Sequence, residues 1–308
     1  MSQWIIIGDG AWGRALSRRL VLNGHDALLV GERRIGNRVP KDVEHTTALA
    51  PALARGERII LAVPADRLEG LLVDAAPHLR GDHRIATGIR GLTPGSHLRP
   101  SEAVGRHTPV RQLAVLAGAA DARALRKKTP AALVVGTAFP AFAEELQAAL
   151  VAPSLRIYTN RDPIGTELAS ILAMVLGVAL GIGRALSVGP ATEATALTRA
   201  LAEMDRVVCG LGGAAKTAYG LAGLGLLAEL AFDPEARSAH AGRALASGDL
   251  DAAAEATEIR AAARALAARC ARHRLRAPML AVVDALFDGH VDAATAMKGL
   301  MTRSARSE

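Results

Sequence analysis

Aromatic residues and cysteines are scarce in this chain of 308 residues. Only 3% of the residues are aromatic, and the two cysteines are Cys209 and Cys270. Two thiols cannot build a disulfide framework, and they have neither the number nor the spacing of a zinc cluster. We therefore expect no bound metal and a reduced, cytoplasmic protein. The apolar run Trp4–Ile7 is too short for a signal peptide, so we expect none.

Long apolar runs are also lacking. The longest uncharged stretch, Leu168–Gly183, is shorter than the roughly 20 apolar residues that a membrane span needs. It contains Gly177, Gly181 and Gly183. The stretch predicts a buried helix inside a helical domain, closely packed at these glycines, and no membrane span.

The remaining composition is that of a folded protein with a basic surface. Hydrophobic residues make up 50% of the chain and charged residues 22%, which excludes global disorder. The 37 basic residues exceed the 30 acidic ones and give a net charge of +7. Such a surface attracts phosphates of any kind. The charge alone does not choose among nucleic acid, acidic lipid and phosphorylated small molecules.

The amino-terminal half alternates short apolar runs with amphipathic segments. Helical patterns such as Trp12–Asn23 and Arg67–His78 lie between the runs. The expected strands are Trp4–Ile7, Ala27–Val30, Ile59–Val63, Arg84–Thr87, Leu113–Leu116, Ala132–Val135 and Arg156–Tyr158. Apolar strands that alternate with helices are typical of a parallel sheet covered on both faces.

The carboxy-terminal half reads differently. Strand signals stop after Asp162-Pro163, and alanine- and leucine-rich helical patterns continue to the end. Glycine-rich segments at Gly210–Gly213 and Gly220–Gly225 predict turns between the helices. We therefore predict an α/β protein of two domains. Residues 1–160 form a mostly parallel sheet domain that binds a dinucleotide, and residues 161–308 form an all-α domain for substrate binding and dimerisation. A homodimer is a candidate assembly, and the oligomeric state is left open.

The first strand leads directly into a glycine-rich segment. We call Gly8-Asp9-Gly10-Ala11-Trp12-Gly13 the glycine turn, and a helical stretch follows it. A GxGxxG pattern between a strand and a helix is typical of dinucleotide binding. Gly8 allows the tight turn, Gly10 leaves room for a pyrophosphate, and Gly13 lets the helix approach the strand. The helix start, with Ala11 and Trp12, offers free N–H groups to the phosphates. We predict NAD or NADP as the cofactor.

The end of the second strand bears on the choice of cofactor. It reads Gly31-Glu32-Arg33-Arg34. A carboxylate here can bind the ribose hydroxyls of NAD, whereas arginines pair with the extra phosphate of NADP. Because two arginines are adjacent, we favour NADP slightly, and both cofactors stay open.

The chain resembles the bacterial NAD(P)-dependent glycerol-3-phosphate dehydrogenases over nearly its whole length. The segments that carry the resemblance are Ile7–Leu16, Asn23-Gly24-His25, Ala62-Val63-Pro64, Arg156–Asn160, Ala194–Val207 (ATALTRALAEMDRV) and Gly220–Gly225 (GLAGLG). The resemblance implies a Rossmann domain followed by a helical substrate domain. It also implies hydride transfer between a nicotinamide and dihydroxyacetone phosphate or glycerol 3-phosphate.

Important family positions differ in this chain. The family places a proton-donating lysine and an asparagine on its long helix, where our alignment has Ala173 and Met174. Its later aspartate falls at Leu226, and its Asn-Ala-Arg is replaced by residues 191–193, Ala-Thr-Glu. A lysine lost together with its aspartate leaves no unpaired buried charge, so the domain can still fold. The catalytic residue is therefore unknown; His240 and Lys216 are candidate substitutes.

Other family positions are kept in part. Arg90 stands for the lysine of the TKGL segment, and the family's GPTFAKE loop becomes the segment from Gly118 through Ala122 to Ala124. The phosphate-binding Ser-Arg-Asn reads Ala236-Arg237-Ser238, and Glu258 matches a cofactor-contacting glutamate. The resemblance thus implies cofactor binding by Arg90, Ala122 and Glu258. It implies substrate binding by Arg90, Gly118, Arg237 and Ser238.

Three functions follow from these patterns. We favour a dehydrogenase of this family that acts on glycerol 3-phosphate or a related small phosphorylated or acidic substrate. The alternative is an inactive NAD(P)-binding relative that acts as a sensor or scaffold, because Ala173 and Leu226 replace reactive residues. Nucleic-acid binding is the third and least favoured, because aromatic stacking residues and a recognised motif are missing. It draws only on the net charge and on Arg260, Arg264, Arg269, Arg272, Arg274 and Arg276.

Overall fold

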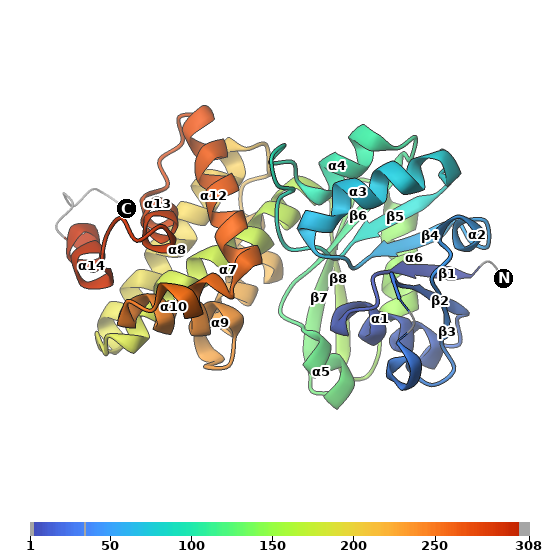
Figure 1. The fold of residues 1–308 in the computed structure, drawn as a ribbon, viewed down its shortest axis with the longest axis horizontal. Helices are drawn as coiled ribbons and strands as arrows, with labels where there is room; N and C mark the ends of the chain where they lie inside the picture. Colours follow the sequence, from blue (N-terminus) through green and yellow to red (C-terminus); the bar gives the residue numbers. More distant parts are fainter. Residues whose placement is uncertain (1–2, 34, 302–308) are drawn as a thin grey trace. The chain divides into compact units, whose positions relative to one another are not determined.

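The computed structural model describes residues 3–33 and 35–301 and divides into two compact units (Figure 1). The first unit is Met1–Glu167 and the second is Leu168–Glu308. The division falls slightly after the boundary predicted between residues 160 and 161, because the first turns of the helix Pro163–Ala185 (α7) pack with the first unit. The functions of the two domains stay predictions.

The first unit is built on one eight-stranded sheet in the order β3-β2-β1-β4-β5-β6-β7-β8. Its strands are β1 (Trp4–Ile7), β2 (Ala27–Val30), β3 (Glu44–Thr46), β4 (Arg58–Leu61), β5 (Arg84–Thr87), β6 (Gln112–Ala117), β7 (Ala131–Gly136) and β8 (Leu155–Asn160). All neighbouring strands run parallel apart from β6 and β7, which are antiparallel. The mostly parallel sheet predicted from the apolar runs is confirmed.

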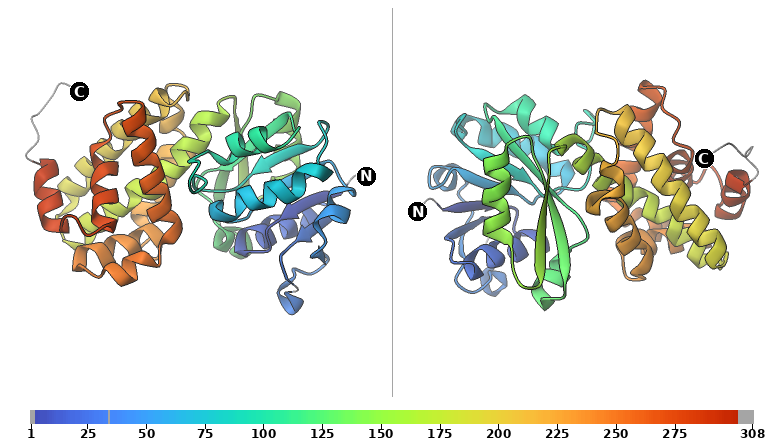
Figure 2. Two further views of the ribbon diagram at one scale, coloured as in Figure 1. Left: turned by 45° about the horizontal axis from the view of Figure 1, so that its top comes forward. Right: turned by 180° about the vertical axis from the view of Figure 1, so that it is seen from behind.

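Helices cover both faces of this sheet (Figure 2). One face carries α1 (Ala11–Leu22), α5 (Ala122–Lys127) and α6 (Pro140–Leu150), and the other carries α2 (Leu49–Leu53), α3 (Ala65–Ala75) and α4 (Pro100–His107). Short 3₁₀ segments occur at Gly36–Arg38 (η1) and Ala76–His78 (η2). Each face has its own hydrophobic core. Because side chains alternate along a strand, Ile6 packs into the core on the face of α1, while Ile5 and Ile7 pack into the core on the face of α3. Apolar side chains on both faces explain why β1 and β2 consist of buried apolar residues alone.

The edge strand β3 was not predicted from the sequence. Its residues Glu44, His45 and Thr46 are polar, and none of them is fully buried. It pairs with β2 alone, so one edge of the strand has no neighbouring strand. The apolar-run criterion that finds buried strands does not detect a short polar one.

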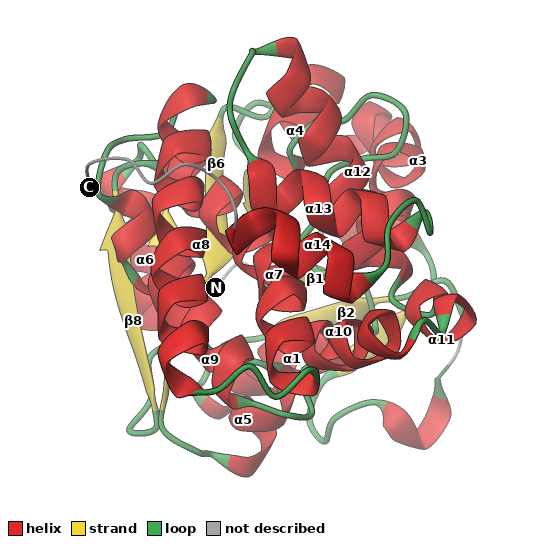
Figure 3. Cartoon of the chain, turned by 90° about the vertical axis from the view of Figure 1, so that its left-hand side faces the viewer, coloured by secondary structure: helices red, strands yellow, loops and turns green. Residues whose placement is uncertain are grey.

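The second unit is helical through the residues that the structure describes, 168–301 (Figure 3). After α7, its elements are α8 (Pro190–Gly210), η3 (Thr217–Tyr219), η4 (Leu221–Gly225), α9 (Leu226–Phe232), α10 (Arg237–Ser247), α11 (Leu250–Ala254), α12 (Thr257–Arg272), α13 (Pro278–Phe287) and α14 (Ala293–Met301). This arrangement confirms the predicted all-α segment after the sheet domain.

The helix α7 passes a length-and-hydropathy test for a membrane span. However, 83% of its most apolar window is buried inside the protein. A Cβ on Gly177 would lie 3.1 Å from the Ser238 hydroxyl oxygen, and one on Gly181 would lie 3.1 Å from the Ala239 Cα. The glycines of α7 therefore let α10 approach closely, as predicted for a buried core helix.

One predicted turn is wrong. The segment Gly220–Gly225 does not form a loop between helices, because Leu221–Gly225 makes a π-helical turn that continues directly into α9. A Cβ on Gly223 would stand 2.1 Å from the Ala218 carbonyl oxygen. The glycines here serve close packing inside a continuous helical segment. A turn is found at the other predicted segment, where α8 ends at Gly210 and Gly212 has a φ of +94°.

Candidate functional site

The glycine turn lies at the point of the sheet where the strand order reverses. It follows β1, whose neighbours are β2 and β4. Gly8 has a φ of +116°, and a Cβ there would stand 2.5 Å from the Ala62 carbonyl oxygen, just beyond β4. A Cβ on Gly13 would stand 1.8 Å from the Gly8 carbonyl oxygen. At both positions a side chain would clash with the backbone, so both need glycine. A Cβ on Gly10 would meet nothing within 4 Å.

The start of α1 is open to a ligand beside Gly10. Gly10 is the N-cap of the helix, and Gly10 and Ala11 are exposed. The first N–H groups of a helix have no partner within it, and the first turn of α1 contains no acidic residue. An anion placed here meets free N–H groups and the positive end of the helix dipole. This geometry fits the pyrophosphate of a dinucleotide.

Trp12 joins the turn to the end of β5. A Cβ on Gly88 would stand 2.6 Å from the indole Nε1 of Trp12, so only glycine leaves room for this ring. Trp12 is partly buried and packs against the core formed with α1. The predicted cofactor residue Trp12 therefore connects the turn after β1 with the loop that begins after β5.

The end of β2 is exposed. Glu32 and Arg33 are both exposed, and a Glu32 carboxylate oxygen lies 3.9 Å from Arg67 Nη1. Arg34, the second arginine predicted to bind the cofactor, lies outside the described residues. The geometry here does not favour one cofactor over the other.

A buried pair below this strand end was missed from the sequence. The carboxylate of Asp9 lies beneath Gly31, where a Cβ would stand 2.1 Å from its Oδ2. That oxygen is 3.7 Å from His45 Nε2 on β3. Both atoms are buried and have no hydrogen-bond partner among the described residues. The sequence shows one half of this pair, because Asp9 is an acidic residue inside the glycine turn. The other half, His45, lies on β3, which the apolar pattern does not detect.

Arg90, Gly118 and Ala122 lie together at the sheet edge where β5 and β6 end. Arg90 donates from Nη2 to the carbonyl oxygens of Gly118 and Ala120, at 3.2 and 3.3 Å. Gly118 has a φ of +116°, and a Cβ there would stand 3.0 Å from the Ala132 carbonyl oxygen. Ala122 begins α5, whose N-cap carboxylate, from Asp121, accepts from the Ala124 N–H at 2.6 Å. Residues that the sequence separates by about 30 positions thus share one loop cluster.

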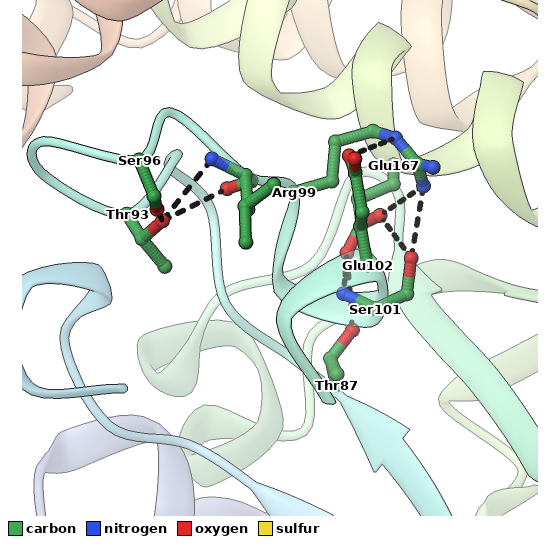
Figure 4. Close-up of polar contacts among 8 residues, drawn as sticks. Thr87, Thr93, Ser96, Arg99, Ser101, Glu102 and Glu167 are labelled. Carbon is green, nitrogen blue, oxygen red and sulfur yellow. Dashed lines mark hydrogen bonds and ion pairs between the residues drawn. The ribbon is translucent and has the colours of Figure 1, made fainter. Parts of the chain in front are cut away.

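A buried carboxylate accepts hydrogen bonds from the end of β5 and from residues at the start of α4 (Figure 4). Glu167 on α7 is fully buried and belongs to the first unit. Arg99 donates to its Oε2 at 2.9 Å, and the Ser101 N–H donates to its Oε1 at 2.9 Å. The Ser101 hydroxyl donates to Oε2 at 2.5 Å, and the Thr87 hydroxyl donates to Oε1 at 3.4 Å. This cluster was not predicted from the sequence, because the donors lie 66 to 80 residues from Glu167 along the chain.

In the second unit, two predicted site residues form an ion pair. Arg237 Nη1 donates to a Glu258 carboxylate oxygen at 2.9 Å, and both side chains are substantially exposed. Ser238, next to Arg237, is only 1% exposed and packs against Gly177. Its hydroxyl oxygen has no hydrogen-bond partner. The Arg237 side chain is exposed, whereas Ser238 is buried. Substrate binding by either residue stays a prediction.

The positions where our alignment expects the family's lysine and aspartate are apolar and buried. Ala173 on α7 and Leu226 at the start of α9 are both fully buried. The substitutes considered from the sequence lie on the surface. His240 is exposed beside Arg243 and Glu235, and Lys216 is exposed in a left-handed turn with a φ of +74°.

Two family models match the chain. The amino-terminal model of NAD-dependent glycerol-3-phosphate dehydrogenase matches residues 4–143, and the carboxy-terminal model matches residues 162–298. The chain belongs to this family. Membership confirms the predicted resemblance and agrees with a Rossmann-type sheet domain followed by a helical segment.

Relatives from several bacteria match this chain over almost its full length. The glycerol-3-phosphate dehydrogenase (NAD(P)+) of Cereibacter sphaeroides is 32% identical over 305 residues, covering 98% of this chain and 99% of that protein. The enzyme of the same name from Deinococcus radiodurans is 33% identical over 320 residues, with coverages of 98% and 96%. The designation NAD(P)+ in both names covers NAD and NADP.

Solved structures share the fold of this chain. The glycerol-3-phosphate dehydrogenase of Coxiella burnetii superimposes with a TM-score of 0.89 at 26% identity, covering 98% of this chain and 99% of that one. The enzyme from Saccharomyces cerevisiae, at 15% identity, has a TM-score of 0.82 and covers 96% and 98%. At that identity the second comparison supports the fold alone.

Proposed function

We propose that this protein is an NAD(P)-dependent dehydrogenase that transfers hydride between a nicotinamide and dihydroxyacetone phosphate or glycerol 3-phosphate, or a closely related small phosphorylated substrate. The observation that carries the proposal is the open space at Gly10, at the start of α1. Gly10 lies between Gly8 and Gly13, where a side chain would clash with backbone atoms. The family membership supports the substrate class. We also propose that the protein acts in the cytoplasm, as its bacterial relatives suggest.

The cofactor would lie along the carboxyl ends of β1 and β4. Gly8, Gly10, Ala11, Trp12 and Gly13 would hold its pyrophosphate, since this turn offers free N–H groups and no competing carboxylate in the helix. The bound nicotinamide would supply the hydride. The other cofactor residues proposed are Glu32, Arg33, Arg34, Arg90, Ala122 and Glu258.

The choice between NAD and NADP rests on the end of β2. We propose a slight preference for NADP, because Arg33 is exposed and is followed in the sequence by a second arginine, and arginines pair with a 2′-phosphate. The exposed Glu32 would oppose that phosphate and favours NAD. Comparing Kd values for NADPH and NADH, in the wild type and in Arg33→Ala and Glu32→Ala, measures the balance directly.

The substrate phosphate needs cations, and this chain offers Arg237 and Arg90. Arg237 is exposed and paired with a single carboxylate, so it can turn to a dianionic phosphate. Arg90 is fixed by the carbonyl groups of Gly118 and Ala120 and can present its charge without reorganising. Neither arginine makes a good proton donor, since a guanidinium rarely gives up its proton. We assign no residue to the proton transfer.

A second candidate function is an NAD(P)-binding sensor without turnover. It is favoured by one observation, the complete burial of the apolar Ala173 and Leu226 at the positions our alignment gives to the family's lysine and aspartate. We propose that the family's proton-donating pair is missing from this chain. A buried apolar pocket cannot protonate an alkoxide, so the reaction would need another donor or would not occur.

One experiment separates the two candidates. Calorimetry measures the binding of NADPH and NADH to the purified protein. A spectroscopic assay then follows oxidation of the bound coenzyme when dihydroxyacetone phosphate is added. Binding with turnover supports the dehydrogenase, and binding without turnover over a broad panel of small keto-phosphates supports the sensor. Failure to bind either coenzyme would remove both.

A further inference from the structure

We propose that Glu167 is a positioning residue that anchors, at both ends, the loop that carries Arg90. The inference rests on the proposed function for its consequence, because Arg90 is there a cofactor- and substrate-binding residue. The anchoring itself is argued from the geometry of the first unit.

The loop in question is residues 88–99, between the end of β5 and the start of α4. Thr87, the last residue of β5, donates its hydroxyl to Oε1 of Glu167. Arg99, the last loop residue, donates to Oε2 at 2.9 Å. Ser101, in the first turn of α4, adds its N–H and its hydroxyl. One carboxylate therefore closes the loop where it leaves the sheet and where it enters the helix, as Figure 4 shows.

The middle of the loop is held by a separate turn. The Thr93 N–H donates to the Leu98 carbonyl oxygen at 2.9 Å, and the Leu98 N–H donates to the Thr93 hydroxyl oxygen at 3.1 Å. The hydroxyls of Thr93 and Ser96 lie 2.5 Å apart, and Ser96 donates to Glu69 at 2.6 Å. This turn comprises Thr93–Leu98 and does not include the segment from Gly88 to Leu92. That segment has contacts of its own: the Gly88 N–H donates to the Leu61 carbonyl oxygen at 2.8 Å, and the Arg90 side chain donates to Gly118 and Ala120. Arg90 lies in that segment, between the turn and the anchor at Thr87.

Glu167 has the properties of a positioning residue and not of a surface charge. Its carboxylate is fully buried, and Arg99, its charge partner, is only 11% exposed in its side chain. A buried carboxylate that accepts several hydrogen bonds is costly to disturb, because each donor loses its partner at once. The residue also stands on α7, the helix that continues into the second unit. Its contacts therefore link the loop that carries Arg90 to the element that joins the two units.

The proposal predicts that Glu167→Gln loosens residues 88–99 specifically. A glutamine amide must place an NH₂ group against either Arg99 or Ser101, both of which are donors, so one anchor is lost. Amide hydrogen exchange of the ligand-free protein, read by mass spectrometry, is expected to speed up at least tenfold in segment 88–99. Exchange in α12 is expected to stay as in the wild type.

Glu203 provides the matched control. It is the buried carboxylate of the second unit, 2% exposed, and it accepts from the N–H groups of Met279 and Leu280 at 2.9 and 2.8 Å. Glu203→Gln is expected to lower stability without changing exchange in segment 88–99. Ser101→Ala is a milder second variant in case Glu167→Gln fails to fold. It removes the hydroxyl that donates to Glu167 and accepts from Arg99 Nη1, and it keeps the Ser101 N–H donor to Glu167.

A double-mutant cycle tests the consequence for binding. NADPH affinity is measured in the wild type, Arg90→Ala, Glu167→Gln and the double variant. If Glu167 acts through Arg90, each single change raises the Kd at least about fivefold and the double variant is little worse than Arg90→Ala. Independent, multiplying effects would overturn the proposal, as would unchanged loop exchange in both Glu167→Gln and Ser101→Ala. If the wild type binds no coenzyme, the proposed function fails while the exchange measurement still decides the anchoring.

Discussion

Gly13 lies so close to Gly8 that a methyl group on residue 13 would stand 1.8 Å from the Gly8 carbonyl oxygen. Gly10, between them, faces open space. One motif thus contains glycines with two different tasks. Gly8 and Gly13 allow the backbone of β1, β4 and α1 to pack, and Gly10 leaves a free approach to the helix start. Substitutions at the two kinds of position should therefore have separable effects.

The first prediction concerns this separation. Gly10→Ala is expected to raise the Kd for NADPH about tenfold, or about 1.4 kcal/mol, while the melting temperature stays close to the wild type. The backbone at Gly10, with a φ of −62°, accepts alanine. Gly13→Ala is expected to lower the free energy of unfolding by about 1–3 kcal/mol, because a backbone oxygen must move. Fluorescence titration and urea unfolding measure the two effects.

Gly70→Ala is the control for both variants. Gly70 is exposed on α3, and a Cβ there would meet nothing within 4 Å. Alanine should stabilise this helix by up to about 1 kcal/mol and leave the Kd unchanged. Unaltered coenzyme affinity in Gly10→Ala would place the cofactor elsewhere on the protein.

The second prediction concerns the phosphate of the substrate. Arg237→Ala is expected to raise the KM for dihydroxyacetone phosphate between about 10- and 100-fold, as expected for one lost charge-assisted hydrogen bond of about 1.5–3 kcal/mol. Stability should change little, because the ion pair with Glu258 is exposed. Steady-state kinetics and thermal unfolding give the two quantities.

Arg264→Ala is the matched control for Arg237. Arg264 is an equally exposed helix arginine that pairs with Asp284 and Asp288. Its removal takes away a comparable charge on a neighbouring helix and should leave the KM near the wild-type value. Equal effects of the two substitutions would point to a general charge effect and not to a phosphate site.

Local motifs could be predicted from the sequence, whereas contacts between distant residues could not. The glycine turn could be predicted because its strand, turn and helix are contiguous and each glycine has a steric reason. The strand β3 was not predicted because its three residues, Glu-His-Thr, are polar. The π-helical turn at Leu221–Gly225 was not predicted because a sequence does not distinguish glycines that permit close packing from glycines that permit a turn.

The candidate site shows the same division. Arg90, Gly118 and Ala122 could be named through the family resemblance, and the structure brings them to one sheet edge. Glu167 could not be identified from the sequence. A glutamate near the start of an apolar helix is ordinarily a solvated charge, and its burial becomes apparent only when Arg99 and Ser101 pack against it.

The third prediction concerns the family positions that we propose to be replaced. Ala173→Lys alone or Leu226→Asp alone is expected to cost about 3–5 kcal/mol of stability, because each introduces an unpaired charge at a fully buried site. If the two positions face one pocket, as the family resemblance implies, the double variant loses less than the sum. Urea unfolding of the four proteins gives the coupling, which we expect to be about 1–3 kcal/mol.

The control for this cycle is Ala179→Lys combined with Leu226→Asp. Ala179 is another buried alanine further along α7. This pair should show no favourable coupling. Turnover of dihydroxyacetone phosphate that appears only in Ala173→Lys/Leu226→Asp would support the sensor hypothesis for the unaltered chain, and strictly additive destabilisation would refute the alignment.

The fourth prediction concerns the two cysteines and pH. Burial, with a smaller contribution from the negative charge of Glu203, raises the pKa of the Cys270 thiol from an ordinary value near 9.0 to about 11. Between these values the unfolded chain has already lost the proton that the folded protein keeps. Stability supplied by this thiol is therefore fully present below pH 9 and falls as the pH rises towards 11, by up to about 1.4 kcal/mol per unit. Cys209 is exposed.

The test compares Cys270→Ala with Cys209→Ala. Removing the Cys270 side chain leaves a cavity whose cost does not depend on pH, so the difference in unfolding free energy from the wild type should shrink steadily between pH 9 and 11. The difference for Cys209→Ala should stay constant over the same range. At pH 8 a thiol reagent should label Cys209 quickly and Cys270 only on unfolding, because thiolate formation and access both favour the exposed residue. Rapid labelling of the Cys209→Ala variant would mean that α12 opens to solvent in the folded protein, contrary to the burial of Cys270.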